Sequence, residues 1–545
     1  MTRLDMETVA SKWIDRHVKL LEPLHRNTCL AHWTASISGR SEDYQQAAAL
    51  QIEFRKLYSD TQEFIELKRL RDSREVMDPL LRRQLDLLYL EYLGNQIPQN
   101  LMEPMVRKAM EAESVFNTFR ARLDGREVTD NQLRDILRHE NSSEKRRAAW
   151  EASKQVGATV ADLLREVVKM RNQAAQHLGF KNFYNMSIIL QEQDVQELSN
   201  LFDELASNTD APFRQAKSEI DAALSKRFGV PVADLMPWHY SDPFFQEAPF
   251  IVDYDLDNPF KGRDVVGLSR DFFRHIGLAA DDVLEDSDLY EKKGKEQHAY
   301  CIDIDRHGDV RILANVRDNE QWMGTMLHEL GHAIYDKNID PNLPYVLRMA
   351  AHTLTTEAVA MFFGRRSRCQ EFARLLLKLP AAEARKYGKA GQRMLRYDLM
   401  VLSRWVQVMM RFEKGLYENP DRDLNALWWD LVERYQGLRR PKNRKDGDWS
   451  SKIHIISHPV YYHNYMLGEM LASQMQRALA RHLAGGPAQE EYARAFVDEP
   501  KAGAYLSQRM LNQGARMHWR ELVVHVTGKT LSSDCFAAQF MPASA

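Results

Sequence analysis

Two histidines four residues apart, His328 and His332, flank the run Glu-Leu-Gly, and this stretch constrains the chain more than any other. Apolar neighbours such as Leu327 and Ala333 predict a buried helix, and they disfavour the plainer alternative of two histidines on a helix surface. Residues four apart share one helix face, so both imidazoles can reach one cation. We therefore expect one Zn²⁺ per chain on this helix, with Glu329 placed to take a proton from a water at the metal.

A zinc ion that keeps one position open for water needs a third protein ligand. The next helical stretch, residues 352–365, offers His352 and Glu357. Glu357 lies beside an apolar stripe that includes Leu354 and Ala358, whereas His352 stands at the start of the stretch, where a capping or supporting role is more common. We favour Glu357 as the ligand; the alternative is a solvated helix glutamate.

Composition excludes several classes of protein. The 545 residues contain no Gly/Ser/Pro-rich linker, repeat or low-complexity tract, and 44% hydrophobic with 28% charged residues is the content of an ordinary soluble protein. A net charge of -3 indicates neither nucleic acid nor an anionic membrane as a partner. We expect a single catalytic domain over residues 1–545; the sequence does not specify an oligomeric state.

The expected location is the cytoplasm. No apolar run is long enough to span a bilayer, and the first residues lack the apolar core of a signal peptide. The four cysteines are widely scattered, which argues against a disulfide framework and fits a reducing compartment.

Most of the chain has the periodicity of amphipathic helices, which predicts a mainly α fold. The clearest stretches are residues 44–70, 77–94, 104–123, 191–227, 391–417, 464–483 and 502–525. Residues 298–304 and 310–314 instead form β-rich runs that predict a hairpin just before the zinc helix. A strand edge there could hold an extended peptide through backbone hydrogen bonds.

With these motifs the chain resembles the peptidyl-dipeptidase family typified by angiotensin-converting enzyme, and more distantly thimet oligopeptidase and oligoendopeptidase F. The resemblance runs from about residue 150 to the C-terminus. It implies a large, two-lobed helical metallopeptidase with a deep central cleft and a small hairpin beside the zinc helix. The N-terminal helices, about 1–125, could form a lid, the zinc site would occupy 328–357, and residues from about 450 to 545 would form a cleft wall.

The resemblance assigns roles at the metal and at the strand beside it. His328, His332 and Glu357 match the family's zinc ligands, and Glu329 matches its general base. At the predicted strand, His298 and the backbone of Ala299 match the family's substrate-holding pair.

A second group of roles follows the motif Lys-Ile-His. Lys452 would bind the substrate's C-terminal carboxylate and His454 would support the transition state. Gln246, within Asp-Pro-Phe-Phe-Gln, would also contact that carboxylate. If this chain has one residue more than the family pattern after His454, Tyr462 would help to hold the carboxylate and Tyr465 would donate a hydrogen bond to the developing oxyanion. We prefer this alignment.

Without that insertion, Tyr461 takes the first tyrosine role and Asn464 falls at the second. The plainer alternative is that Tyr461, Tyr462 and Tyr465 are packing aromatics, and this holds for at least one of them.

The chain departs from the family pattern in three places. Gln297 and Asn315 stand near the positions of a disulfide that flanks the hairpin in secreted members. Asn464 replaces a chloride-binding arginine, which puts chloride activation in doubt. Met361 replaces an aspartate that supports a zinc histidine, so another acceptor, a backbone carbonyl or another acid, must serve.

Together these features predict a zinc peptidase that acts on short peptides and releases C-terminal dipeptides. One rival is an oligoendopeptidase that cuts internally, favoured by the 25-residue interval from His332 to Glu357. The more distant rival is a catalytically silent scaffold that binds peptides.

Overall fold

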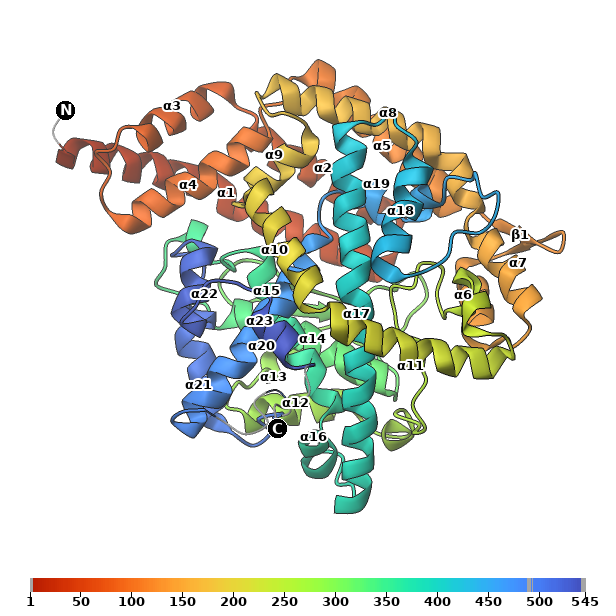
Figure 1. The fold of residues 1–545 in the computed structure, drawn as a ribbon. Helices are drawn as coiled ribbons and strands as arrows, with labels where there is room; N and C mark the ends of the chain where they lie inside the picture. Colours follow the sequence, from red (N-terminus) through yellow and green to blue (C-terminus); the bar gives the residue numbers. More distant parts are fainter. Residues whose placement is uncertain (1–2, 488–491, 493, 541–545) are drawn as a thin grey trace. The chain divides into compact units, whose positions relative to one another are not determined.

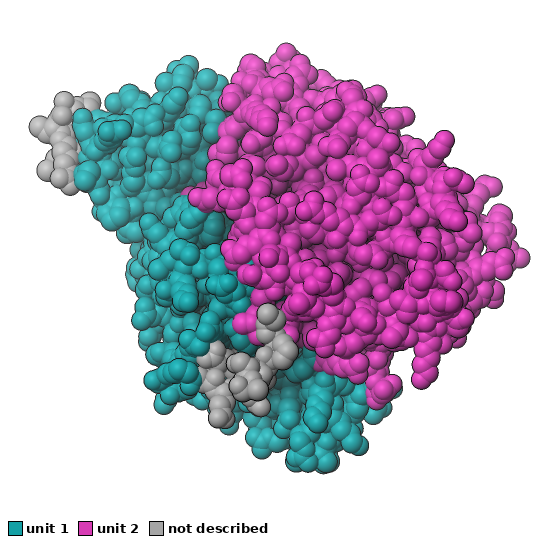
Figure 2. Space-filling view, viewed as in Figure 1, with its two compact units in different colours: residues 1–96, 254–392, 467–536 teal, residues 97–253, 393–466, 537–545 magenta. Residues whose placement is uncertain are grey.

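The computed structural model describes residues 3–487, 492 and 494–540, and its dominant element is the α-helix (Figure 1). The chain divides into two compact units, each assembled from stretches far apart in sequence (Figure 2). Unit 1 comprises residues 1–96, 254–392 and 467–536, and unit 2 comprises residues 97–253, 393–466 and 537–545. The expected mainly α fold is confirmed, while its action as a single catalytic domain stays a prediction.

Unit 1 contains the N-terminal helices, the predicted hairpin and the predicted zinc helix. Its elements are α1 (Arg3–Ser38), α2 (Ser41–Tyr58), α3 (Thr61–Asp72), α4 (Pro79–Gly94), α12 (Val265–His275), α13 (Asp281–Glu285), β3 (Tyr300–Asp303), β4 (Val310–Leu313), α14 (Glu320–Lys337), the 3-10 turn η4 (Tyr345–Leu347), α15 (Thr353–Gly364), α16 (Gln370–Leu375), α21 (Pro500–Arg509) and α22 (Trp519–Thr527).

Unit 2 is helical apart from one short hairpin, β1–β2. Its elements are α5 (Gln99–Thr118), β1 (Ala121–Leu123), β2 (Arg126–Val128), α6 (Asp130–His139), α7 (Ser143–Ser153), α8 (Gln155–His177), α9 (Phe183–Leu190), α10 (Val195–Asn208), α11 (Asp210–Phe228), α18 (Leu424–Gln436) and α19 (His454–Ser457). Three helices run from one unit into the other: α17 (Ala381–Glu418), α20 (His463–Ala484) and α23 (Asp534–Ala538).

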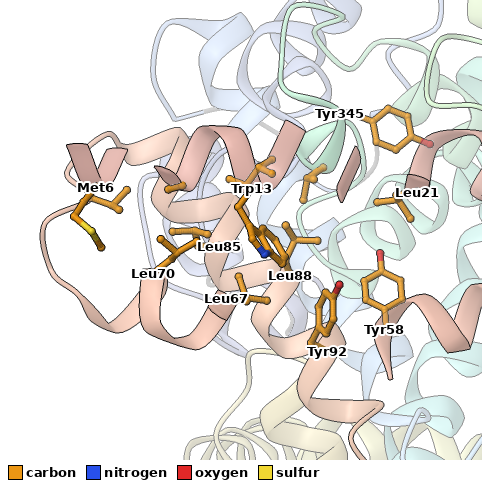
Figure 3. Close-up of a cluster of buried hydrophobic side chains, with 14 residues drawn as sticks. Met6, Trp13, Leu21, Tyr58, Leu67, Leu70, Leu85, Leu88, Tyr92 and Tyr345 are labelled. Carbon is orange, nitrogen blue, oxygen red and sulfur yellow. The ribbon is translucent and has the colours of Figure 1, made fainter. Parts of the chain in front are cut away.

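The first four helices pack around a buried aromatic and aliphatic cluster of unit 1 (Figure 3). Trp13 of α1, Tyr58 of α2 and Tyr92 of α4 lie in this cluster, and Tyr345 of η4 joins them. Because η4 follows the zinc helix in the chain, the N-terminal helices are anchored to the unit that carries the metal motif. The predicted lid, about 1–125, divides between the units at residue 96, and its motion stays a prediction.

The predicted hairpin is confirmed. Strands β3 and β4 pair antiparallel, with Tyr300 opposite Leu313, and both pack against α14. Hydrogen bonds connect the two ends of the hairpin in place of a disulfide. The buried Asn315 side-chain amide donates to the carbonyls of Glu296 (3.0 Å) and Gln297 (3.2 Å). A polar side chain thus holds the base of the hairpin, and the four cysteines are free thiols.

Three of the predicted helical stretches are broken in the structure. The stretch 44–70 is two helices, because Asp60 accepts hydrogen bonds from the backbone of Gln62 and Glu63 and caps α3. The stretch 191–227 breaks at Thr209 without a side-chain cap, and 502–525 is interrupted by a 3-10 turn at Leu511–Gln513. Among the residues described, no helix combines the length and apolar content needed to cross a bilayer. The cytoplasmic location stays a prediction.

Candidate metal centre

The zinc motif lies on α14, and the favoured third ligand lies on α15, which packs directly against it. Asn319 starts α14 by accepting a hydrogen bond from the backbone of Trp322. His352 starts α15, where its ring Nδ1 accepts from the backbone of Leu354 at 2.9 Å. His352 is therefore a capping residue, as the sequence indicates, and Glu357 remains as the candidate ligand of this helix.

The three candidate ligands converge. Ligand atoms of His328, His332 and Glu357 all lie within 4.8 Å of one another, and His328 Nε2 is 3.9 Å from Glu357 Oε2. Ligands held at about 2 Å from one zinc ion lie roughly 3–4 Å apart, so small side-chain adjustments close this set on a single ion. Two imidazoles and one carboxylate also form a known catalytic zinc donor set. The residues present therefore fit Zn²⁺.

Desolvation keeps both half-buried histidines in the form that binds metal. It lowers the pKa of His328 to about 4 and holds the pKa of His332 well below its usual value, with the neighbouring His328 adding to the effect. A neutral imidazole offers a lone pair to a cation without first losing a proton. At neutral pH the pair is thus ready to bind a metal ion.

Thr356 supports one of the candidate ligands, although no sequence pattern indicates this role. The hydroxyl of Thr356 lies 2.6 Å from Nδ1 of His332, which leaves Nε2 of that ring for the metal. A supporting hydrogen bond of this kind fixes the orientation and the tautomer of a ligand histidine. For His332, the group in place of the family's aspartate is therefore a threonine hydroxyl, one residue before Glu357, and the expectation of a backbone carbonyl or another acid is wrong here.

Replacing Thr356 with Val should lower zinc affinity about 10- to 100-fold, the usual cost of removing such a supporting group. Val has nearly the same shape as Thr but has no hydroxyl for His332. Competition with a chromogenic chelator measures the affinity. Thr356→Ser, which keeps the hydroxyl, serves as the control and should stay close to wild type; an equal loss in both variants would show that packing, and not the hydrogen bond, is responsible.

Glu329 is buried, with 7% of its surface exposed, and its carboxylate accepts the backbone N–H of Cys301 in β3. Burial, followed by repulsion from Glu357, raises the pKa of Glu329 to about 8 with no cation bound. A divalent cation nearby would instead lower the pKa of Glu329, because it stabilises the carboxylate. The hairpin thus orients the candidate base, a role for Cys301 that the sequence pattern does not signal.

The close approach of the two metal-site helices depends on Gly331. A Cβ at this position would lie 2.7 Å from Cα of Ala360 on α15, nearer than side chains pack. The second helix therefore lies directly on the backbone of the zinc motif.

Replacing Gly331 with Ala should separate α14 from α15 and weaken both folding and zinc binding. Overpacking costs roughly 1–3 kcal/mol, which outweighs the roughly 1 kcal/mol that Ala gains over Gly in a helix. Denaturant unfolding and zinc titration measure the two effects. Gly324→Ala on the same helix is the matched control, because its Cβ would meet the Gly364 carbonyl oxygen at an ordinary 3.5 Å. Equal stability of the two variants would refute the close-approach argument.

Unit 2 contains the residues predicted to hold a substrate carboxylate. Nζ of Lys452 donates to Oε1 of Gln246 at 2.6 Å, although 206 residues separate them in the chain. The ammonium lies between 5.4 and 5.5 Å from the ring centres of Phe244, Trp405 and Tyr462. Only 6% of Lys452 is exposed, and burial lowers its pKa to about 8.

The buried Lys452 ammonium forms no ion pair with any carboxylate of the described residues. The acid that raises its pKa most, Asp242, accepts instead from the backbone N–H groups of Phe244, Gln246 and Glu247. A buried cation without an anionic partner is costly, and an arriving carboxylate removes that cost.

Three tyrosines of unit 2, Tyr461, Tyr462 and Tyr465, form a cluster with His454. The ring of Tyr462 lies 5.0 Å from that of His454 and 5.4 Å from that of Tyr465, and Tyr461 stacks edge-on against Tyr465 at 5.2 Å. Among these tyrosines, Tyr462 is the one whose ring lies near the Lys452 ammonium. This placement favours the alternative with one inserted residue, and the catalytic roles of Tyr465 and His454 stay predictions.

Asn464 has a structural role. This fully buried residue donates to Oε1 of Gln191 at 2.7 Å and accepts from Nε2 of Gln193 at 3.1 Å. The protein itself therefore uses both ends of this amide.

At the hairpin, His298 is exposed and Ala299 is half-buried, both just before β3, and their substrate roles stay predictions.

A buried helix with His-Glu-x-x-His, joined by a glutamate from the next helix, defines the class of this protein as a zinc metallopeptidase of mainly α fold. The family model described as "Angiotensin-converting enzyme" matches residues 4–232 and 256–544. The chain belongs to the angiotensin-converting enzyme family.

Its similarity to individual curated proteins is low but extensive. It is 21% identical over 448 residues to "Angiotensin-converting enzyme" of Theromyzon tessulatum, covering 76% of this chain and 71% of that protein. It is 24% identical over 446 residues to "Angiotensin-converting enzyme-like protein Ace3" of Mus musculus, covering 75% of this chain but 59% of the relative. "Carboxypeptidase 1" of Bacillus subtilis (strain 168) is 24% identical over 208 residues, or 34% of this chain and 41% of the relative.

Proposed function

We propose that this metallopeptidase releases dipeptides from the free C-terminus of short peptides, with one Zn²⁺ on His328, His332 and Glu357. The observation that carries the proposal is Lys452, a buried ammonium paired with Gln246 and with no acid of the described residues in an ion pair. Such a group suits a carboxylate that every peptide with a free C-terminus possesses. The names of the curated relatives, angiotensin-converting enzymes and one carboxypeptidase, support action on peptides.

The chain's own residues would divide the chemistry among them. A bound Zn²⁺ would supply Lewis acidity toward the scissile carbonyl and the attacking water. Glu329, held by the Cys301 N–H, would accept a proton from that water and deliver it to the leaving amine. Tyr465 and His454 would donate hydrogen bonds to the carbonyl oxygen as it gains charge.

Substrate binding would come from two further groups. Lys452, Gln246 and Tyr462 would bind the free carboxylate. His298 and the backbone of Ala299 would hold the extended peptide beside β3. Short peptides are the partners we propose, with neither nucleic acid nor a membrane involved, in the cytoplasm.

A second candidate is an endopeptidase that ignores the C-terminus. The 25-residue interval between His332 and Glu357 favours it, because this spacing is that of the oligopeptidases. A binding scaffold without activity is a more distant candidate, and the complete set of metal-site residues opposes it.

Product mapping separates these candidates. An unstructured peptide with a free C-terminus and its C-terminal amide are incubated with the zinc-loaded protein, with and without a chelator, and the products are identified by mass spectrometry. We expect successive dipeptides from the free peptide, slow cleavage of the amide and no cleavage with the chelator. Internal cuts in both peptides would establish the endopeptidase, and release of single residues a carboxypeptidase. Intact peptides beside stoichiometric zinc would establish the scaffold.

A further inference from the structure

Val460 has a backbone conformation that its side chain disfavours. Its φ is +57°, in the left-handed region, and among the described non-glycine residues with positive φ it is the one with a β-branched side chain. Such a conformation costs of order 1–3 kcal/mol and persists where the surroundings impose it. Val460 is buried and lies two residues before Tyr462 and five before Tyr465. Its conformation therefore sets the path of the chain into the tyrosine cluster.

Two side chains hold the backbone of Val460. Oε1 of Glu413, on α17, accepts the Val460 N–H at 2.8 Å, and Nε2 of Gln191, at the end of α9, donates to the Val460 carbonyl at 3.3 Å. Gln191 is itself fixed by a bond to the Ser187 carbonyl at 2.9 Å and by the Asn464 amide at 2.7 Å. Both backbone polar groups of Val460 are thus bound by side chains from helices distant in the sequence.

Glu413 is an unusual group in this position. It is 2% exposed, and the Val460 N–H is its one hydrogen-bond donor among the described residues. Burial raises its pKa to about 7, while the Val460 N–H and the charge of Arg171 act against that rise. A buried carboxyl that serves one backbone N–H is costly for stability alone. A role in the geometry of the bound segment accounts for it better.

Arg171 secures the other side of the same segment. This arginine of α8 is 8% exposed and donates to the carbonyls of Ile455 (3.4 Å) and Ile456 (2.8 Å), in the helix that begins with His454. It also donates to the Tyr417 hydroxyl at 3.1 Å on α17, one turn after Glu413. Charged side chains of unit 2 therefore hold this segment at two points: Arg171 before Val460, and Glu413 at the Val460 N–H itself.

We propose that Glu413 is a positioning residue: by holding Val460 in the left-handed conformation, it sets the orientation of Tyr462 and Tyr465. The catalytic consequence of that orientation rests on the proposed function, whereas the orientation itself does not. Glu413 acts through the backbone and touches no reacting atom.

The test uses the full-length zinc protein and three substitutions. Glu413→Ala removes the acceptor, Glu413→Gln keeps an oxygen for the Val460 N–H, and Glu413→Ala combined with Val460→Gly removes the conformational strain. Glu418→Ala is the matched control, because Glu418 is exposed on the same helix and pairs with Lys414 on the surface. Zinc content and thermal unfolding of every variant are measured alongside.

The first measurement does not depend on activity. The protein is labelled with fluorotyrosine, and the ¹⁹F signals of Tyr462 and Tyr465 are assigned with Tyr462→Phe and Tyr465→Phe. We expect both signals to shift in Glu413→Ala and to return towards the wild-type positions in Glu413→Gln and in the double variant. Unshifted signals in a folded Glu413→Ala protein would overturn the proposal.

The second measurement is the kinetics of peptide hydrolysis. We expect kcat of Glu413→Ala to fall about 10- to 100-fold, the cost of misplacing groups by about 1 Å, with KM changed less. Adding Val460→Gly to Glu413→Ala should raise kcat again by about tenfold or more. Loss of kcat without recovery, beside unshifted fluorine signals, would refute positioning. Shifted signals in a protein that hydrolyses no peptide would leave the positioning intact and refute the proposed function.

Discussion

Replacing Glu329 with Gln should lower kcat by about 10²–10⁴-fold, the contribution of a positioned general base, while one zinc ion per chain remains bound. Gln has the same shape and still offers an oxygen to the Cys301 N–H, but it cannot take a proton from the attacking water. Because the base acts in the chemical step, kcat and kcat/KM should fall together. Steady-state kinetics on a quenched peptide, with metal analysis of the same sample, measure both quantities.

The metal analysis makes the Glu329 result specific. Glu329 is not among the converging ligand atoms, which come from His328, His332 and Glu357, so its substitution should not release the ion. Glu357→Gln is the contrasting variant and should lower zinc occupancy as well as activity. Unchanged turnover in zinc-loaded Glu329→Gln protein would remove Glu329 as the base, whatever happens at Glu357.

The parts of the site that follow a fixed helical spacing could be predicted from the sequence. His328 and His332 are one helical turn apart, and the choice of Glu357 over His352 followed from the apolar stripe of the next helix. The pairing of Lys452 with Gln246 needed the family resemblance, because no local pattern connects residues 206 apart.

The supporting contacts could not be predicted, because they have no spacing of their own. Thr356 on α15 contacts His332 on the neighbouring helix α14, so no spacing along one helix indicates the contact. Cys301 donates to Glu329 through its backbone N–H, a group that does not depend on the residue type. The left-handed Val460 is a further case, since a β-branched residue signals the opposite backbone preference. Tertiary packing, and not local propensity, fixes each of these contacts.

Replacing Lys452 with Met should lower kcat/KM for peptides with a free C-terminus by about 30- to 4000-fold, and for the matching amides only slightly. Losing one partner of a buried charge pair costs about 2–5 kcal/mol, and 1.4 kcal/mol is tenfold. Met keeps much of the side-chain volume among the rings of Phe244, Trp405 and Tyr462, so packing should survive. Lys445→Met, an exposed lysine nearby in the chain, is the matched control.

The two peptide forms separate binding from damage to the fold. A general structural defect lowers cleavage of both forms, whereas loss of carboxylate binding affects the free acid selectively. Equal losses on the acid and the amide would therefore remove Lys452 from the carboxylate site. Gln246→Ala should give the same selectivity with a smaller loss, because Lys452 keeps its charge when its 2.6 Å hydrogen bond to Gln246 is removed.

The pH dependence of that selectivity gives an independent check on Lys452. Burial lowers the pKa of this ammonium to about 8, so in the free enzyme the cation is present below that pH and is lost as the pH rises through it. Because kcat/KM reports ionisations of the free enzyme, the ratio of acid to amide cleavage should fall above about pH 8. In Lys452→Met the same ratio should be low and flat. A wild-type ratio that stays constant through this range would mean that the preference for a free carboxylate, if observed, comes from a different cation.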